Sequence, residues 1–400
     1  MNKLAAFAAL FSPLKGPAWQ AWQRGDFERA AELAREDKRA GPRLLLLLAH
    51  ITGDYDLAVR EYAKLSAIEK NTELVLEAVF ESLLHLGRAT EALEMFAPLA
   101  KIRAYRSYYL RAQFMANQPM TVDITSTCEL PFVKSEITDL FPGISGRLNG
   151  QDTTIRFDTG GAYLQMSPSL AARFGVKAQG DVKMFADLKM DAASMGVLEE
   201  MVIGTARLTN VPVIILDMLD KSALTEIDRS PIMGTNVLQQ FLTTIDTPNQ
   251  RFILSRRGDY AAHFARLSGR QAKVPFVLWG SHFMIARGAL DGVEMSFFID
   301  NGLIMESAEF GQPSLLVPKS LGSGWAATDT EHMRRLPGML RLGTLEQANA
   351  TAMVTSDAKW RPIAGSMGGV RVGALLSYGF LKHRAWTLDF DRREYVFHSG

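Results

Sequence analysis

The chain has 400 residues, of which 47% are hydrophobic and 22% are charged, and its formal net charge is +1. This length allows two or three domains with substantial cores. The nearly balanced charge gives no electrostatic basis for binding nucleic acid or an anionic membrane, so no nucleic-acid partner is expected. The single cysteine, Cys128, excludes a disulfide framework within the chain.

The amino terminus carries a weak targeting signal. Residues 4–11 form an apolar run behind Lys3, as in a signal peptide, but the run is short and lacks a small-x-small cleavage site. No segment reaches the about 18–20 apolar residues that a membrane-spanning helix needs. We therefore expect no membrane span and a cytoplasmic location, with a periplasmic or secreted protein as the open alternative.

The first quarter of the chain repeats a glycine-centred pattern at Gly25, Gly53 and Gly87, with spacings of 28 and 34 residues. Such spacings are typical of helical hairpins stacked as a short solenoid. Residues 1–117 are therefore expected to be helical, and they resemble degenerate tetratricopeptide repeats. Their concave face could bind a protein partner, or the helices could pack on the rest of the chain as a structural extension, or dimerise.

The last expected helix of this region interleaves arginine and tyrosine side chains. Arg103, Arg106 and Arg111 alternate there with three tyrosines. A short run of this kind is more typical of a solvated capping face than of a nucleic-acid site.

Two similar motifs further along the chain each contain an aspartate. Residues 155–161 read IRFDTGG and residues 297–303 read FFIDNGL, and each Asp lies 8 residues after an Asn-Gly or Asp-Gly pair. Those pairs favour a two-residue hairpin turn, so each Asp is expected where a strand leaves a sheet. Gly160 and Gly302 then allow a sharp reversal, and the Thr159 hydroxyl can bond locally or across a symmetry axis. The pattern predicts two carboxylates on rigid loops.

Further landmarks recur with a numbering offset that stays between 139 and 144. We therefore expect residues of about 127–256 and 272–400 to be two copies of one β-rich lobe, within domains of residues 118–256 and 257–400. The matched landmarks are Leu130-Pro131-Phe132-Val133 with Val274-Pro275-Phe276-Val277, Leu148-Asn149-Gly150 with Leu290-Asp291-Gly292, Gly204-Thr205 with Gly343-Thr344, and Gly234 with Gly373.

Asp158-Thr159-Gly160 after an apolar strand, followed by Ile232-Met233-Gly234, resembles the retropepsin and pepsin-like aspartic proteases. The resemblance covers about 270 residues, essentially everything after residue 127. It implies a mainly β, duplicated double-lobe fold with a cleft between the lobes. It also implies a catalytic pair of Asp158 and Asp300, supported by the loop residues Thr159, Gly160, Asn301 and Gly302.

The resemblance also implies a mechanism without metal or cofactor. Two carboxylates about 3 Å apart cannot both ionise, so together they hold one proton and can act as acid and base on a bridging water. The substrate would be a peptide or protein. Flaps over the cleft are expected near residues 183–196 and 322–338, with Phe185 and Trp325 as candidate substrate contacts or, alternatively, as core-filling side chains.

The second motif departs from the family pattern in three places. Asn301 stands where the family has Thr or Ser, Leu303 replaces a small residue, and Arg371-Val372-Gly373 is the expected counterpart of Ile232-Met233-Gly234. Four interpretations therefore stay open. They are an active aspartic endopeptidase, a non-catalytic pseudoprotease that binds peptide or protein, an enzyme that uses the Asp pair on a non-peptide substrate, and activity through dimerised first lobes without Asp300.

Overall fold

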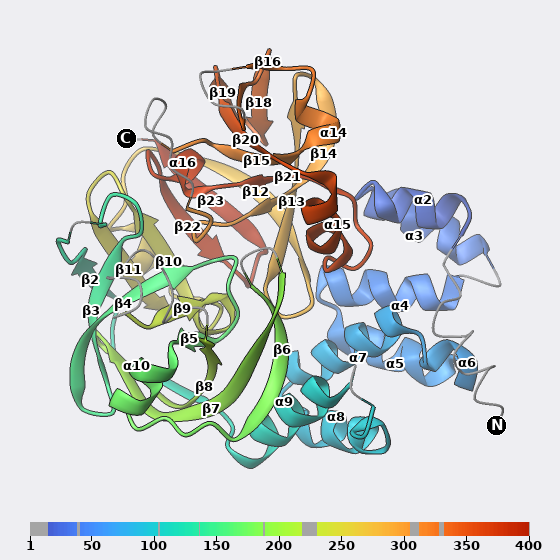
Figure 1. The fold of residues 1–400 in the computed structure, drawn as a ribbon, viewed down its shortest axis with the longest axis horizontal. Helices are drawn as coiled ribbons and strands as arrows, with labels where there is room; N and C mark the ends of the chain where they lie inside the picture. The colour runs from blue at the N-terminus through green and yellow to red at the C-terminus, as the bar shows by residue number, and fades with distance from the viewer. Residues whose placement is uncertain are drawn as a thin grey trace.

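The computed structural model describes residues 15–37, 41–102, 105–135, 137–186, 189–217, 230–304, 312–327 and 332–399. Helices come first along the chain and lie on one side of two β lobes, the first lobe below and the second above in Figure 1. Within these described ranges, no helix is long and apolar enough to cross a membrane.

The amino-terminal region is helical, as expected. Its elements are α2 (Pro17–Gln23), α3 (Phe27–Glu36), α4 (Gly41–Thr52), α5 (Tyr55–Lys64), α6 (Ala67–Lys70), α7 (Glu73–His85), α8 (Ala89–Phe96), the 3-10 turn η1 (Ala97–Leu99) and α9 (Arg106–Asn117).

The three glycines of the repeated pattern form the turns between consecutive helices. Gly25, Gly53 and Gly87 have φ of 73°, 88° and 70°, a backbone conformation that side chains with a Cβ rarely adopt. They separate α2 from α3, α4 from α5 and α7 from α8. The Asp after each of the first two turns caps the next helix, because the side chains of Asp26 and Asp54 accept backbone N–H groups of that helix.

The first lobe is an eight-stranded sheet with the order β1-β8-β5-β9-β4-β3-β7-β6. Its elements are β1 (Thr121–Ile124), β3 (Gly143–Leu148), β4 (Gln151–Asp158), β5 (Leu164–Met166), α10 (Pro168–Arg173), β6 (Gly180–Ala186), β7 (Lys189–Ile203), β8 (Ala206–Leu216), β9 (Ile232–Gly234) and α12 (Thr235–Leu238).

The second lobe and the strands that join the lobes form a fifteen-stranded sheet. Its elements are β2 (Cys128–Pro131), β10 (Phe241–Asp246), β11 (Arg251–Arg256), α13 (Tyr260–Phe264), β12 (Arg270–Trp279), β13 (Phe283–Leu290), β14 (Val293–Ile299), β15 (Leu315–Pro318), α14 (Lys319–Gly322), β16 (Ala326–Ala327), β17 (Met333–Arg335), β18 (Met339–Leu342), β19 (Leu345–Ala348), β20 (Thr351–Thr355), α15 (Asp357–Gly365), β21 (Val372–Leu376), α16 (Tyr378–Leu381), β22 (Ala385–Asp389) and β23 (Glu394–Ser399).

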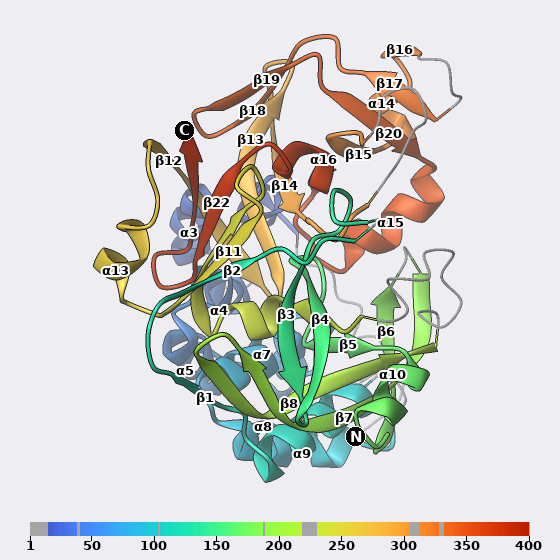
Figure 2. The same ribbon diagram turned by 90° about the vertical axis from the view of Figure 1, so that its left-hand side faces the viewer.

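The two lobes meet in the strand order β2-β11-β10-β22-β23-β12, which we call the interlobe sheet. Figure 2 shows strands of this sheet between the lower first lobe and the upper second lobe. At its centre β10 pairs antiparallel with β22, so that Thr244 lies opposite Thr387. The chain is therefore a helical region followed by a β-rich fold of two lobes.

The predicted hairpin turns occur in both lobes. Asn149 and Gly150 join β3 to β4 with φ of 44° and 78°, and Asp291 and Gly292 join β13 to β14 with φ of 50° and 77°. Positive φ at both central residues matches the right-handed twist of the paired strands. Each turn sends its second strand towards one of the two Asp loops.

One expected correspondence between the lobes is wrong. Strand β9 pairs parallel with β4 and places Gly234 opposite Asp158, but β21 pairs parallel with β14 and places Leu376 opposite Ile299. The residue next to Asp300 in this register is Ser377. Gly373 lies four residues earlier, between the partners of Ser296 and Phe297, where the β14–β21 pairing is irregular. The apolar pair before it is Leu375-Leu376, so the charge of Arg371 does not lie at this position.

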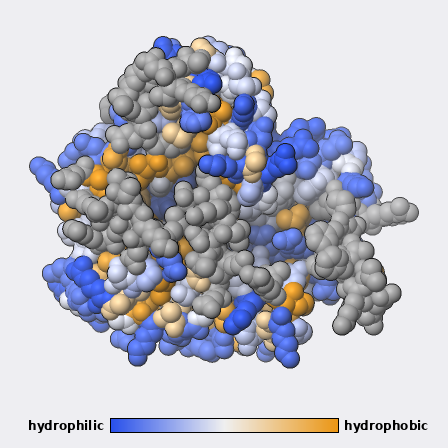
Figure 3. All heavy atoms as spheres, viewed as in Figure 1, coloured by the Kyte–Doolittle hydropathy of each residue, from blue (hydrophilic) through white to orange (hydrophobic). Residues whose placement is uncertain are grey.

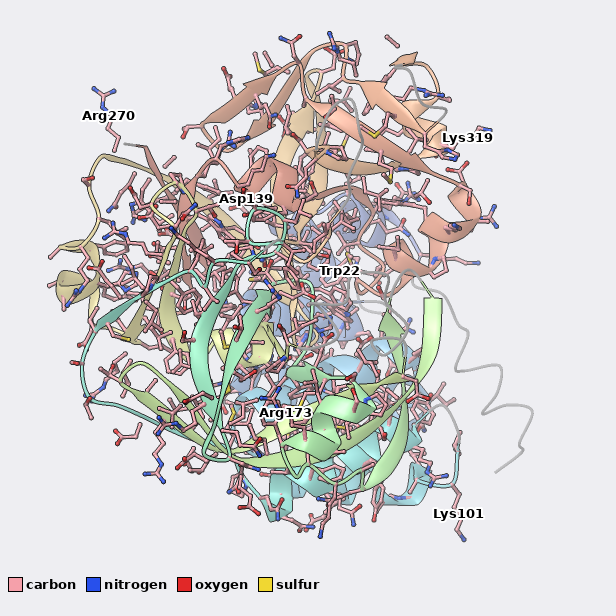
Figure 4. All side chains as sticks on the ribbon, turned by 60° about the vertical axis from the view of Figure 1, so that its left-hand side comes forward. Trp22, Lys101, Asp139, Arg173, Arg270 and Lys319 are labelled. Carbon is pink, nitrogen blue, oxygen red and sulfur yellow. The ribbon has the colours of Figure 1, made fainter. Side chains whose placement is uncertain are left out.

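Arg371 instead bonds to the helical region. Its backbone N–H donates to the carbonyl oxygen of Gln23 at 2.7 Å. Helices and second lobe also share a hydrophobic core, in which Trp22 and Trp279 pack edge to face at 6.0 Å. The indole N–H of Trp22 donates to the carbonyl oxygen of Gly368 at 2.9 Å. In Figure 4 Trp22 lies inside the molecule, whereas Lys101, Arg270 and Lys319 point outwards.

A buried polar cluster lies against the interlobe sheet. The ring nitrogens of His263 bond to the hydroxyls of Thr244 and Ser255, both at 2.7 Å, and Thr244 in turn bonds to Thr387. His263 is fully buried. Burial, and next the positive charge that His398 would carry, lower the pKa of His263 to about 4. The folded protein therefore holds this imidazole neutral.

This lowered pKa predicts a loss of stability in acid. The unfolded chain binds a proton at His263 once the pH falls below about 6.5, whereas the folded protein does not until about pH 4. The free energy of unfolding should thus fall by up to roughly 3 kcal/mol between pH 7 and pH 4 through this group and then level off. Denaturant titrations should show a shallower pH slope for His263→Gln than for the wild type. Equal slopes would contradict the assignment.

Candidate active site

Asp158 and Asp300 each lie where a central strand of a lobe ends. Strand β4 runs between β3 and β9, and β14 runs between β13 and β21, so both strands are paired on both sides. The two loops face each other so closely that a Cβ on Gly160 would clash with the carboxyl of Asp300, and one on Gly302 with that of Asp158. Both positions therefore need glycine for the two carboxyl groups to meet.

The carboxyl groups of Asp158 and Asp300 hydrogen-bond to each other. The N–H of Gly160 donates to Asp158 Oδ1 at 2.8 Å, and the N–H groups of Gly302 and Leu303 donate to Asp300 Oδ1 at 2.8 and 3.1 Å. Both aspartates are half-buried. Backbone donors from their own loops thus hold each carboxyl in place.

Burial raises the pKa of both carboxyls above the ordinary value of an aspartate. The pKa of Asp300 is raised further by the negative charge of Asp158 and by the hydrogen bond between them. Bonds from Gly302 and Leu303 stabilise the charged form but do not cancel this effect. The pair therefore retains a shared proton at pH values where isolated carboxyls have lost theirs.

Asn301 completes a reciprocal network beneath the aspartates. The Thr159 hydroxyl accepts from Asn301 N–H at 3.0 Å and donates to the carbonyl of Ile299 at 3.3 Å. The Asn301 side chain makes the corresponding two bonds to the first lobe with two different atoms. Its Oδ1 accepts from the Thr159 N–H at 2.7 Å, and its Nδ2 donates to the carbonyl of Phe157 at 2.8 Å. Both side chains are buried. The Asn in place of Thr thus leaves the interlobe network intact.

Leu303 points its side chain away from this network. It packs against the core that the helices share with the second lobe. Its backbone N–H still serves Asp300, as a small residue's would. The larger side chain therefore reflects the presence of the helical region.

Hairpins occur where the flaps were expected. β6 and β7 form one in the first lobe, and β16 and β17 form one in the second. Phe185 lies in β6 opposite Met190, but its side chain is outside the described part of the structure. Trp325 directly precedes β16, is half-buried and packs against the main hydrophobic core, which fits the core-filling alternative.

Tyr163 is a residue of the site that the sequence pattern did not single out. It lies five residues after Asp158 with φ of 55°. Its hydroxyl accepts from Arg111, whose guanidinium pairs with Glu81. Arg111 is therefore a partner inside the molecule and not part of a solvated capping face. Neither the Arg111–Glu81 ion pair nor the left-handed backbone of Tyr163 can be predicted from the local sequence.

No metal site accompanies the two aspartates in the described ranges. Nowhere in them do three His, Cys, Asp or Glu side chains come close enough together to hold a metal ion.

A comparison with protein-family models finds a match within the first lobe. Residues 144–237, which include Asp158 and Gly234 but not Asp300, match the family model described as "Aspartyl protease". No curated protein matches the sequence. Among solved structures, the crystal structure of basic 7S globulin from soybean is similar with a TM-score of 0.43 and 9% identity, over 70% of this chain and 96% of that one. Residues 144–237 are thus an aspartyl protease domain.

Proposed function

We propose that this protein is an aspartic endopeptidase in which Asp158 and Asp300 activate one water molecule. The observation that carries the proposal is the hydrogen bond between the two carboxyls at the meeting point of two glycine loops. A pair that shares one proton offers a base and an acid side by side. The raised pKa of both members keeps that proton available towards neutral pH.

In the proposed reaction, the ionised carboxylate takes a proton from water as the water oxygen bonds to the peptide carbonyl carbon. The protonated carboxyl gives its proton to the carbonyl oxygen, so that a neutral tetrahedral diol forms. When the diol collapses, the C–N bond breaks, one hydroxyl proton returns to the pair and the leaving nitrogen gains a proton. The pair ends the cycle with one proton, as it began.

A peptide or protein substrate would lie between the lobes. The hairpins β6–β7 and β16–β17 lie on the same side of the molecule in Figure 2, one from each lobe, and are the proposed covers for the bound chain. Phe185, in the first of them, stays the proposed substrate contact. Figure 3 shows a band of apolar side chains below the second lobe on this face, which would favour apolar side chains in the substrate.

We propose that the helices are tetratricopeptide-like hairpins that serve here as a structural extension. Helices α2, α3, α4, α5 and α7 contribute their apolar faces to the core of the second lobe, and α9 packs on the first lobe. These faces are therefore not free to bind another protein. A protein partner would have to use the outer face of the helices.

The test is cleavage of a diverse peptide library between pH 3 and pH 8, with products identified by mass spectrometry. We expect cuts at internal peptide bonds. A peptide that carries a hydroxyl in place of the scissile carbonyl should inhibit them, because the hydroxyl occupies the position of the water. A metal chelator should leave the rate unchanged. Without any cleavage of the library, the endopeptidase proposal loses to the pseudoprotease or to an enzyme with another substrate.

A further inference from the structure

A partly buried ion pair of the helical region reaches the loop that carries Asp158. On α9, Arg111 pairs with Glu81 of α7 through two bonds of 2.7 and 3.0 Å. Its Nη2 also donates to the Tyr163 hydroxyl at 2.8 Å. Glu81 and Tyr163 are 4% and 5% exposed. Because Glu81 neutralises the guanidinium, Arg111 acts on Tyr163 as a fixed hydrogen-bond donor and not as a free charge.

Tyr163 is held at three points in a conformation that it would not adopt alone. Its φ of 55° is in the left-handed region, which is uncommon for a bulky residue. Its N–H donates to Asn236 Oδ1 at 2.9 Å, and its carbonyl accepts from the N–H of Gly234. Gly234 is the residue that pairs with Asp158 across β4 and β9. The position of Tyr163 is thus tied to the position of Asp158.

The side of Tyr163 that faces the helices borders a cavity. This cavity of about 410 Å³ lies between the helices and both lobes, and Glu81, Tyr163 and Asn236 are on its wall. Tyr163 is only 5% exposed, and the Arg111 guanidinium lies 5.4 Å from the centre of its ring. Loss of the bond from Arg111 would therefore remove the polar restraint that fixes the hydroxyl end of the ring.

Helix α9 also supports the hairpin proposed to cover the substrate. A Leu110 methyl lies 3.1 Å from where a Cβ on Gly180 would be, at the start of β6. Phe114 of the same helix shares a hydrophobic cluster with Met195 of β7 and with Tyr163. One helix therefore contacts both the base of the β6–β7 hairpin and the Asp158 loop.

Among the described residues, the second lobe makes no such hydrogen bond to the helices at the equivalent position. The N–H of Ser377 donates to the carbonyl of Ser314, just as Gly234 does to Tyr163, so Ser314 corresponds to Tyr163. The Ser314 hydroxyl accepts from Gln347 of its own lobe at 2.9 Å. The loop of Asp158 is thus linked to the helices through a hydrogen bond, whereas the loop of Asp300 meets them through the apolar side chain of Leu303.

We infer that Tyr163 and Arg111 are positioning residues that set the place of Asp158 relative to Asp300, and that the helical region is part of the active-site framework. This inference rests on the proposed function for its catalytic consequence. Its structural part, that Arg111 holds the Asp158 loop through Tyr163, stands without it. A displacement of about 1 Å at a reacting group can lower a rate by about 10²-fold.

Tyr163→Phe tests the inference because it removes only the hydroxyl and keeps both the ring and the Arg111–Glu81 pair. We expect kcat to fall by roughly 10- to 100-fold while KM changes by less than about 2-fold. The pH range of activity should narrow, because carboxyls that move apart affect each other's pKa less. Arg111→Lys keeps the charge but not the fork of donors. Its kcat should lie between that of Tyr163→Phe and that of the wild type.

Tyr260→Phe is the matched control. It also removes a hydroxyl that bonds to a charged side chain, Asp389, but lies on α13, away from the Asp loops. Its kinetics and pH profile should equal those of the wild type. A similar loss of kcat in this control would overturn the inference, since the effect would then follow from general destabilisation.

Amide hydrogen exchange tests the structural part without any substrate. The N–H groups of Gly160, Gly161 and Tyr163 should exchange at least about 10-fold faster in Tyr163→Phe than in the wild type, and unchanged in Tyr260→Phe. Unchanged exchange in Tyr163→Phe would overturn the inference even if the wild type cleaves peptides. If the wild type cleaves nothing, the proposed function fails, and faster exchange would still support the link.

Discussion

Asp158→Asn and Asp300→Asn are each expected to reduce peptide cleavage by roughly 10²- to 10⁴-fold, the range that general acid–base catalysis supplies. Either change leaves a single carboxyl beside an amide that cannot exchange a proton. The shared proton that the bonded pair holds is then lost. Initial rates on the best library peptide, measured at each pH, give the comparison with the wild type.

The same substitutions should stabilise the fold near neutral pH. The folded pair keeps a proton that the unfolded chain has released, so the pair lowers the free energy of unfolding as the pH rises above the ordinary carboxyl range. Asp300→Asn removes this penalty and should raise the melting temperature by about 2–4 °C at pH 7 and by less at pH 4. Asp152→Asn, at an exposed position on the same strand as Asp158, is the control. It should leave the rate unchanged and alter the free energy of unfolding by less than about 1 kcal/mol, because its ion pair with Arg147 is exposed.

The two variants together separate the interpretations. If Asp158→Asn is inactive while Asp300→Asn keeps full activity, the pairing within one chain is wrong and dimerised first lobes gain support. If both are inactive and both are more stable at pH 7, the pair is the catalytic centre.

Removal of residues 1–117 is expected to abolish cooperative folding of the remaining chain. The helices supply half of a core whose other half is the second lobe, with Trp22 against Trp279 and with Phe298 and Leu375 in the same cluster. Deletion would expose these apolar side chains to water at a cost of about 25 cal/mol for each Å². Circular dichroism of residues 118–400 should show no sharp thermal transition, and the fragment should aggregate.

A point substitution gives the same test within a full-length chain. Trp22→Ala should lower the free energy of unfolding by about 3–5 kcal/mol, since it empties a fully buried site and leaves the carbonyl of Gly368 without its donor. Ile68→Ala, at a side chain that is 66% exposed, should change it by less than about 0.5 kcal/mol. A soluble 118–400 fragment with a sharp transition and undiminished cleavage would show that the helices are dispensable.

The sequence by itself determined the features that depend on a few neighbouring residues. The glycine turns between helices and the Asn149-Gly150 and Asp291-Gly292 hairpins follow from backbone conformations that only a few residue types adopt easily. The same reasoning placed Asp158 and Asp300 at strand ends. Gly160 and Gly302 were expected for a sharp backbone reversal, but the structure needs glycine there because the opposite carboxyl leaves no room for a Cβ. Two such loops on two similar lobes were enough to predict that the carboxyls meet.

Only the tertiary structure decided the features that depend on register and on contacts between distant segments. The register between β14 and β21 puts Ser377, not Gly373, beside Asp300, and no local pattern reveals that register. Whether Asn301 preserves the network between the lobes could be decided only once its partners on the other loop were known. Its amide oxygen and nitrogen make the bonds that a single hydroxyl would otherwise make. The contact of Arg111 with Tyr163 likewise depends on how the helices dock on the lobes, since contacts between distant segments are a property of the packed molecule and not of neighbours in the chain.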